Sequence, residues 1–155
     1  MNRTVFLIHG SYGSPKENWI PWLTTELQQC GCTVIAPTFP TPNNQSLESW
    51  LEVFEPYRHS LNKDSLVVGH SLGPAFLMHI IQILSFSITA SYFVAPFISE
   101  LGDPTFDDVN RTFFHHFDWK KIKGNCKKFT IFYSGNDPYV PRAQAITLAK
   151  NLGVT

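Results

Sequence analysis

A serine lies between two glycines near the middle of the chain, in the run Gly69-His70-Ser71-Leu72-Gly73. The apolar residues Leu66-Val67-Val68 lead directly into this run, and Pro74-Ala75-Phe76-Leu77 leave it with the composition of a helix start. A strand, a sharp turn and a helix hold a serine hydroxyl away from the backbone, where it can attack a carbonyl carbon. The glycines allow the strand and the helix to approach closely enough for that turn. The sequence therefore predicts that Ser71 is a nucleophile for acyl transfer.

Backbone N–H groups near Ser71 are expected to stabilise the negative oxygen that such an attack produces. The N–H of Leu72 is placed at the start of the predicted helix, where the helix dipole favours an anion. The run His9-Gly10-Ser11-Tyr12-Gly13 follows another apolar stretch, and its glycines free the backbone to fold over the nucleophile. We expect the second donor of this oxyanion hole to be the N–H of Ser11 or of Tyr12.

A carboxylate follows the last predicted strand, in the run Gly135-Asn136-Asp137-Pro138-Tyr139-Val140-Pro141. Asp-Pro pairs also favour turns for reasons of their own, so this run has a purely structural explanation as well. Beside a nucleophilic serine, however, a carboxylate can hold a histidine in the correct tautomer and stabilise its protonated form. We therefore predict that Asp137 is the acid of a catalytic triad.

Short apolar runs alternate with helical patterns along the chain, which predicts an α/β fold. The predicted strands cover residues 5–8, 33–36, 65–68, 89–94 and 129–133. The predicted helices cover residues 19–29, a segment that opens at Ser46 or Ser49, and residues 72–84, 118–122 and 142–152. The short connections favour a three-layer parallel sheet with helices on both faces. Ligands bind at the carboxyl ends of such strands, where His9, Ser71 and Asp137 are expected.

The size and charge of the chain restrict its class. Its 155 residues fit one domain, residues 1–155. Lys+Arg and Asp+Glu each number 12 and cancel, which argues against nucleic acid or an anionic membrane as a partner, since both bind basic surfaces. The apolar stretch from Ala75 to Leu84 is too short to span a bilayer, and no signal peptide is recognisable at the start.

Three cysteines, Cys30, Cys32 and Cys126, occur in the chain. An odd number does not form a disulfide framework, and the spacing of the first two does not suit a zinc site or a thioredoxin-like motif. We expect reduced thiols in a cytoplasmic protein, with no metal and no cofactor.

Three features together resemble the family of small α/β-hydrolases that includes retinoblastoma-binding protein 9 and its bacterial relatives. They are His9-Gly10 with Trp19-Ile20-Pro21-Trp22-Leu23 shortly after, the Ser71 run, and Asp137-Pro138-Tyr139-Val140-Pro141, which matches the acid motif of the family. The resemblance covers nearly the whole chain. It implies a minimal sheet without a large lid and a Ser-Asp-His triad that acts on small esters or amides.

The histidines depart from the pattern of this family, in which the triad histidine follows the acid after one more strand. The six histidines of the chain are His9, His59, His70, His79, His115 and His116, and none follows Asp137. We expect the first four to have structural roles, and His9 and His70 to support their turns. His115 and His116 could swing over the pocket from a loop, although this order would be wrong for the fold.

We therefore expect the triad histidine to lie beyond Thr155, in a chain truncated at its C-terminus. Gly153 ends the last predicted helix, and Val154-Thr155 has the composition expected for the beginning of a further strand. Without that strand, residues 129–133 would form an unprotected apolar sheet edge. The alternatives are a naturally complete pseudoenzyme and a rewired enzyme. A chain without the base is expected to be nearly inactive.

The function predicted from these residues is the hydrolysis of small carboxylic esters or amides. The expected pocket residues are His9, Tyr12, Trp19, Phe97, Phe114 and Tyr139, a mainly aromatic set that suits a small apolar acyl group. One alternative is a catalytically silent protein that binds a ligand or another protein in the same cleft. A flavodoxin-like nucleotide binder is disfavoured, because the loop after the first strand lacks G-x-G-x-x-G and a P-loop lysine. The oligomeric state is not indicated by the sequence.

Overall fold

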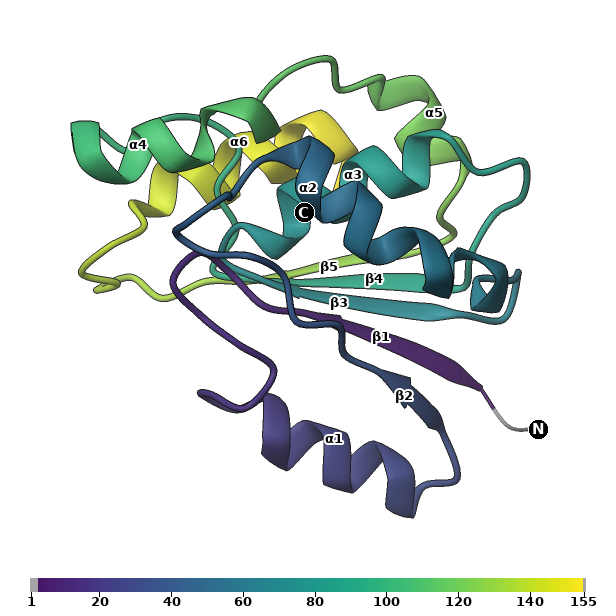
Figure 1. Ribbon diagram of the computed structural model, residues 1–155. Helices are drawn as coiled ribbons and strands as arrows, with labels where there is room; N and C mark the ends of the chain where they lie inside the picture. Colours follow the sequence, from purple (N-terminus) through teal and green to yellow (C-terminus); the bar gives the residue numbers. More distant parts are fainter. Residues whose placement is uncertain (1–2, 155) are drawn as a thin grey trace.

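The computed structural model describes residues 3–154 and contains a five-stranded sheet in which neighbouring strands are parallel (Figure 1). The strands are β1 (Thr4–Ile8), β2 (Thr33–Ile35), β3 (Leu66–His70), β4 (Ala90–Val94) and β5 (Phe129–Phe132). Their order across the sheet is β2-β1-β3-β4-β5. The predicted parallel sheet is confirmed, and the observed strand ends lie within one or two residues of the predicted ones, which is the usual uncertainty of such boundaries.

Helices cover both faces of this sheet, as predicted. The helices are α1 (Ile20–Gln29), α2 (Leu47–Phe54), α3 (Gly73–Gln82), α4 (Pro104–Asn110), α5 (Trp119–Gly124) and α6 (Arg142–Leu152), with 3₁₀ turns at Glu55–Ser60 and Arg111–Phe113. In Figure 1, α1 lies on one face of the sheet and the other helices lie on the opposite face. Helix α4 was not among the helices predicted from the sequence. Its start is nevertheless marked in the sequence, because Asp103 caps it and Pro104 is its first residue.

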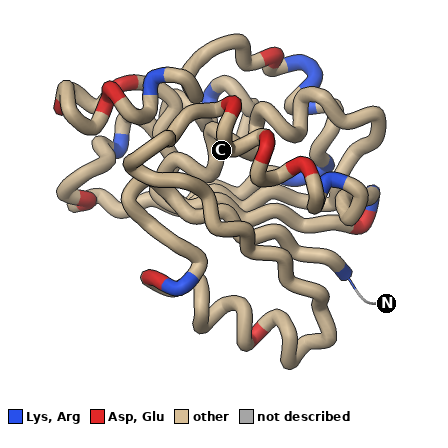
Figure 2. Tube along the Cα trace, in the orientation of Figure 1, with Lys and Arg blue, Asp and Glu red and all other residues tan. Residues whose placement is uncertain are grey.

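Alternation along β1 divides the core into two parts. Phe6 and Ile8 face the larger core under α2 and α3, whereas Val5 and Leu7 face the smaller core under α1. All four side chains are buried, as expected for a central strand of a sheet covered on both faces. Lys, Arg, Asp and Glu are correspondingly absent from the five strands of residues 3–154 and lie on the helices and loops (Figure 2).

Local capping explains where the helices begin and end. The Ser46 hydroxyl accepts a hydrogen bond from the N–H of Ser49, and the Ser49 hydroxyl accepts one from the N–H of Ser46. This reciprocal pair is a capping box that starts α2. The carboxylate of Asp118 accepts from the N–H of Lys121 and starts α5. Helix α6 ends at Gly153, whose φ of +71° is the left-handed conformation that glycine adopts readily.

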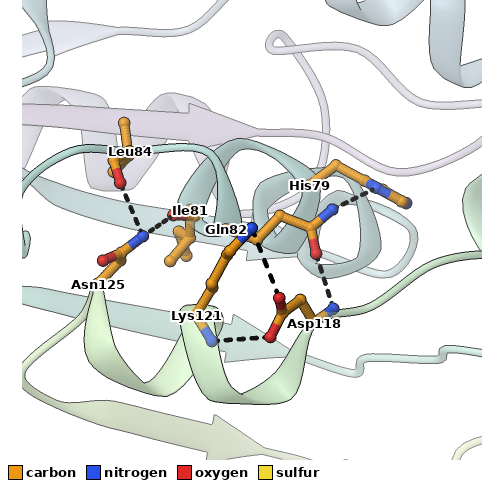
Figure 3. Close-up of polar contacts among 7 residues, drawn as sticks. All are labelled: His79, Ile81, Gln82, Leu84, Asp118, Lys121 and Asn125. Atoms are coloured by element: carbon orange, nitrogen blue, oxygen red, sulfur yellow. Dashed lines mark hydrogen bonds and ion pairs between the residues drawn. The ribbon is translucent and has the colours of Figure 1, made fainter.

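A small polar network ties the C-terminal end of α3 to α5 (Figure 3). The side-chain N–H groups of Asn125 donate to the carbonyls of Ile81 and Leu84, each at 2.9 Å. The side-chain oxygen of Gln82 accepts from the N–H of Asp118 at 2.9 Å. Because α3 begins directly after the Ser71 turn, this network fixes the far end of the helix that carries the predicted nucleophile.

The C-terminal edge of the sheet is open among the described residues, where β5 pairs with β4 alone. Phe132 and Tyr133 are 52% and 46% exposed there. Val154 packs against the larger core, and Thr155, the second residue of the predicted strand start, lies outside the described residues. Within residues 3–154 no helix has the length and apolarity needed to cross a bilayer.

Candidate active site

Ser71 occupies a sharp turn between β3 and α3. Its φ is +58°, in the left-handed region that non-glycine residues rarely adopt. Its N–H donates to the carbonyl of Val94 at 2.9 Å, so the turn continues the pairing of β3 with β4. The helix begins two residues later, at Gly73. The neighbouring strand thus holds a strained backbone in place, which is typical of functional sites.

Three glycines make this turn possible, because each lies where a side chain would collide with backbone or with the serine. A Cβ atom on Gly69 would lie 2.6 Å from the backbone nitrogen of Pro74, and one on Gly73 would lie 2.6 Å from the carbonyl oxygen of Ile8. A Cβ atom on Gly10 would lie 2.6 Å from the Cβ atom of Ser71. Strand, turn, helix and the loop after β1 are therefore in direct contact around Ser71.

A cavity of about 550 Å³ opens beside the Ser71 turn. It is lined by Ser11, Tyr12, His70, Ser71, Ala95, Leu101, Asp103, Phe106, Asp137, Pro138, Tyr139 and Val140. Three of these residues, Tyr12, Ser71 and Ala95, have φ values of +58°, +58° and +48°. Left-handed backbone in non-glycine residues is unfavourable and needs support from its surroundings. Its concentration around one cavity therefore marks this cavity as the candidate active site.

Asp137 lines the same cavity as Ser71, on the segment that follows β5. One of its carboxylate oxygens, Oδ1, accepts hydrogen bonds from the N–H groups of Tyr139 and Val140 at 2.9 and 3.0 Å. The turn that an Asp-Pro pair favours is thus present, and it orients the carboxylate. The second oxygen, Oδ2, has no protein partner among residues 3–154, so it remains available as an acceptor.

The backbone N–H groups around Ser71 are not equally available. The N–H of Tyr12 donates to the hydroxyl of Thr41 at 2.6 Å, and the N–H of Ser71 is bonded to Val94. In contrast, the N–H groups of Ser11 and Leu72 have no hydrogen-bond partner in the described part of the chain. Of the two alternatives for the second oxyanion donor, Ser11 is therefore the one whose N–H is free.

Two of the histidines have structural hydrogen bonds. The Nδ1 atom of the buried His9 donates to the carbonyl of Gly10 at 2.8 Å, and its Nε2 atom accepts from the N–H of Phe39 at 3.0 Å. His79 is buried as well, with Nε2 2.9 Å from the carbonyl of Phe113. Because a carbonyl oxygen only accepts, the nitrogen that faces it carries the proton in each ring. The other ring nitrogen accepts a hydrogen bond in each case, in His9 from Phe39 and in His79, at Nδ1, from the side-chain N–H of Gln82 at 3.3 Å, so both rings are neutral.

The other described histidines lie at different places relative to Ser71 and Asp137. His70 lines the cavity together with both residues, and its ring packs edge-on against Trp19 with the ring centres 5.5 Å apart. Burial lowers the pKa of His70, and the charge of Asp137 acts in the opposite direction. His115 and His116 are exposed, and His115 lines a separate cavity of about 310 Å³ near Phe114. Neither of these two residues lines the cavity of Ser71.

Burial lowers the pKa of His9 and of His79 below the ordinary histidine value of 6.5. An unfolded chain takes up a proton at each of these positions before the folded chain does. The stabilising effect of keeping them neutral is present above pH 6.5 and is lost as the pH falls. We therefore expect the free energy of unfolding to decrease below about pH 6.5, by at most about 1.4 kcal/mol per pH unit for each histidine.

Urea unfolding between about pH 8 and about pH 5.5 measures this slope. The variant His79→Gln is expected to show a shallower slope than the unmodified chain. His59→Gln, at an exposed position, is the matched histidine substitution for comparison. A free energy of unfolding that stays constant over this range would contradict the prediction.

The wall of the cavity differs from the predicted one. Tyr12 and Tyr139 line it. His9, Trp19, Phe97 and Phe114 do not line it. His9 is buried and hydrogen-bonded to Gly10 and Phe39, and Trp19 packs in the core under α1. Phe97 is buried behind Phe106, and Phe114 lines the second cavity. Sequence position after a strand places a residue near the site but does not decide which way its side chain points.

The segment from Leu101 to Phe106 supplies a part of the wall that was not predicted from the sequence, as do His70 and Ala95. Leu101, Asp103 and Phe106 all line the cavity. The buried carboxylate of Asp107 holds this segment, accepting from the N–H groups of Leu101 and Gly102 at 2.7 and 2.8 Å. The pair Asp103-Pro104, which starts α4, is the sequence signal from which this segment could have been predicted. Within residues 3–154, no group of three or more His, Cys, Asp or Glu side chains is arranged to hold a metal ion.

Comparisons with protein families and with individual proteins both find serine hydrolases or hydrolases similar to this chain. The family model described as serine hydrolase matches residues 5–155. The chain is 28% identical over 154 residues to YdeN of Bacillus subtilis, a match that covers 98% of this chain and 80% of YdeN. It is also 28% identical over 135 residues to the serine hydrolase RBBP9 of Rattus norvegicus, covering 86% of this chain and 70% of that protein.

Solved structures agree with this assignment. The crystal structure of the ydeN gene product from B. subtilis matches with a TM-score of 0.90 at 27% identity, over 99% of this chain and 83% of that one. Est1E from Butyrivibrio proteoclasticus, solved with ferulic acid bound, matches with a TM-score of 0.75 at 19% identity, over 98% of this chain and 76% of that one. At this lower identity the likeness to Est1E concerns the fold alone.

Proposed function

Because the chain belongs to the serine hydrolase family, we propose that it supplies the nucleophile, the acid and the oxyanion hole of an enzyme that hydrolyses small carboxylic esters or amides. The observation that carries this proposal is the left-handed Ser71 turn, which lines one cavity together with Asp137. Oriented reacting groups in a shared cavity are the basis of acyl-transfer catalysis.

In the proposed mechanism, the Ser71 oxygen attacks the carbonyl carbon of the substrate while its proton passes to a histidine. The carbonyl oxygen becomes negative and is stabilised by the N–H groups of Leu72 and Ser11, which are otherwise unpartnered within residues 3–154. The histidine then gives the proton to the departing alcohol or amine, and water releases the acyl group from Ser71 by the reverse steps. Asp137 orients the histidine through its free carboxylate oxygen.

We assign this histidine to residues that follow Thr155. Three observations support the assignment. No histidine follows Asp137 in the sequence. Among the described residues, His9 and His79 face backbone carbonyls, and His115 and His116 are exposed and do not line the cavity. His70 lines the cavity, directly precedes Ser71 in the chain and packs against Trp19. The chain also covers only 80% of YdeN, so this relative contains residues that have no counterpart here.

The cavity wall favours an acyl group that is small and apolar or aromatic. Tyr12, Leu101, Phe106 and Tyr139 are large aromatic and aliphatic side chains in its lining, and the rings of Tyr12 and Phe106 are stacked with centres 6.1 Å apart. Flat apolar groups pack well on such a surface. We propose that the protein acts on a small molecule in the cytoplasm, where its free cysteines would remain reduced.

The test is hydrolysis of a p-nitrophenyl ester of a short acid, with and without added imidazole as a replacement base. We expect a trace rate without imidazole, because loss of the base of a serine triad costs about 10⁶ in kcat in the protease subtilisin. Imidazole should raise the rate in proportion to the concentration of its neutral form. The variant Ser71→Ala is the control for the reaction of imidazole with the ester itself.

Two results would contradict this proposal. Equal rates for the unmodified chain and Ser71→Ala at every imidazole concentration would favour the alternative, a catalytically silent protein that binds ligands in the same cavity. Fast turnover without imidazole that disappears in His115→Ala or His116→Ala would instead indicate a rewired triad.

A further inference from the structure

Three polar side chains from distant parts of the chain meet beside the Ser71 cavity. Ser11 follows β1, Gln45 precedes α2, and Asn110 ends α4. The hydroxyl of Ser11 donates to the side-chain oxygen of Asn110. The side-chain nitrogen of Gln45 donates to the Ser11 hydroxyl at 3.0 Å and to the Asn110 oxygen at 2.7 Å. We call these three residues the Ser11 cluster.

The orientation of the Gln45 amide is determined by its neighbours. Its Nε2 atom faces three acceptors, which are the Ser11 hydroxyl, the Asn110 oxygen and the carbonyl of Val109 at 3.1 Å. Rotating the amide by half a turn would place its oxygen against two carbonyl-type oxygens. The nitrogen must therefore point into the cluster.

The same orientation leaves the side-chain oxygen of Gln45 buried and without a hydrogen-bond partner among the described residues. A buried amide oxygen without a donor lowers the stability of the fold. Asn110 is fully buried as well. A cluster selected for stability alone would not retain this oxygen, so the arrangement points to a role for the other end of the amide, at Ser11.

That role follows from the position of Ser11. Ser11 lines the Ser71 cavity, and its N–H is unpartnered in the described part of the chain, whereas the next N–H, of Tyr12, is bound to Thr41. The residues that hold these two positions, Thr41 and Gln45, belong to the same loop between β2 and α2. This loop therefore fixes both residues that follow Gly10, one through its N–H and the other through its hydroxyl.

We propose that Gln45 and Asn110 are positioning residues which hold the Ser11 hydroxyl and thereby aim the Ser11 N–H at the oxygen that becomes negative during catalysis. This inference rests on the proposed function. Gln45 and Asn110 touch neither the substrate nor Ser71, and they act through Ser11. Their removal should slow the chemical step and leave substrate binding unchanged, because the interaction is made in the transition state.

The experiment follows the covalent labelling of Ser71 by an uncharged alkyl fluorophosphonate in the presence of imidazole. In this reaction the Ser71 oxygen bonds to phosphorus, fluoride leaves, and imidazole takes the proton. Intact mass measured over time and probe concentration separates the maximal labelling rate from the apparent binding constant. Each molecule needs to react only once, so slow chemistry remains measurable.

Gln45→Met keeps the length of the side chain and removes its hydrogen bonds. The matched control is Gln144→Met, because Gln144 also bridges loop residues, accepting from the N–H of Ile98 at 3.1 Å and donating to the Ser99 hydroxyl at 2.8 Å. Gln144 does not line the Ser71 cavity. We expect Gln45→Met to lower the maximal labelling rate by about tenfold, a fraction of the ~10²–10³ seen when an oxyanion donor is lost completely. The apparent binding constant should stay the same, and Gln144→Met should label at the unmodified rate.

Ser11→Ala provides a second test that does not depend on the stability of Gln45→Met. It removes the hydroxyl but keeps the N–H, so it should slow labelling to a similar extent. In the Ser11→Ala background, Gln45→Met should have no further effect, since Gln45 acts through that hydroxyl. Equal labelling rates for Gln45→Met and Gln144→Met, or effects of Ser11→Ala and Gln45→Met that multiply, would overturn the inference alone. Failure of the unmodified chain to label at Ser71 would overturn the proposed function together with it.

Discussion

Gly10→Ala is expected to reduce the imidazole-dependent, Ser71-dependent rate by about two to three orders of magnitude. A Cβ atom at this position would lie 2.6 Å from the Cβ atom and 3.1 Å from the hydroxyl oxygen of Ser71. The Ser71 turn cannot retreat, because its N–H is paired with Val94 and Gly73 is in contact with Ile8. The loop after β1 must therefore move, and the Ser11 N–H moves with it out of the proposed oxyanion hole.

Gly124→Ala is the matched control for this substitution. Gly124 ends α5 and does not have a positive φ, and a Cβ atom added there would meet no described atom within 4 Å. Alanine there should leave the rate unchanged and the fold at least as stable. The ester assay with imidazole measures both variants, and circular dichroism verifies that both are folded. A folded Gly10→Ala variant with a rate close to that of the unmodified chain would contradict the proposed placement of the oxyanion loop.

Trp50→Ala is expected to destabilise the fold by about 3–5 kcal/mol. Trp50 is fully buried, and its ring stacks on Phe39 with centres 4.5 Å apart. It also packs edge-on against Phe76 and Phe113, and its indole N–H donates to the carbonyl of Pro40 at 2.9 Å. Removal leaves a cavity among aromatic rings and an unpaired carbonyl. Because small domains are stable by only about 5–15 kcal/mol in total, this loss is a large part of the stability.

Trp22→Ala tests whether the effect depends on burial. Trp22 lies on α1 and is 63% exposed, so its replacement should change the free energy of unfolding by less than about 0.5 kcal/mol. Urea unfolding followed by circular dichroism measures both variants, since tryptophan fluorescence itself changes with the substitution. A similar loss of stability in both variants would show that the cluster around Trp50 is not the centre of the core.

The Ser71 turn could be predicted from sequence because its causes are local. The glycines on either side of Ser71, the apolar strand before it and the helix after it are contiguous in the chain. The same holds for the cap at Ser46 and for the end of α6 at Gly153, where the required backbone conformation and the residue that permits it coincide. Alternation of strands and helices was sufficient for the parallel sheet.

The cavity wall could not be predicted in the same way. Phe97 and Phe106 both follow β4, and both are aromatic, yet Phe97 is buried behind Phe106 and only Phe106 lines the cavity. The difference arises from Asp107, which holds the loop before α4 through two backbone N–H groups. No local pattern distinguishes the two side chains, because their directions depend on how that loop packs.

The sequence by itself determined the α/β class, the Ser71 turn and the candidate acid at Asp137, since these depend on periodicity and on residues that are neighbours in the chain. Only the tertiary structure decided that Ser11 rather than Tyr12 has a free N–H among the described residues, because Thr41 and Gln45, far along the chain, take up the other groups of this loop. Hydrogen bonds between distant segments form only where the packing of the fold brings those segments together. A single stretch of residues does not determine that packing.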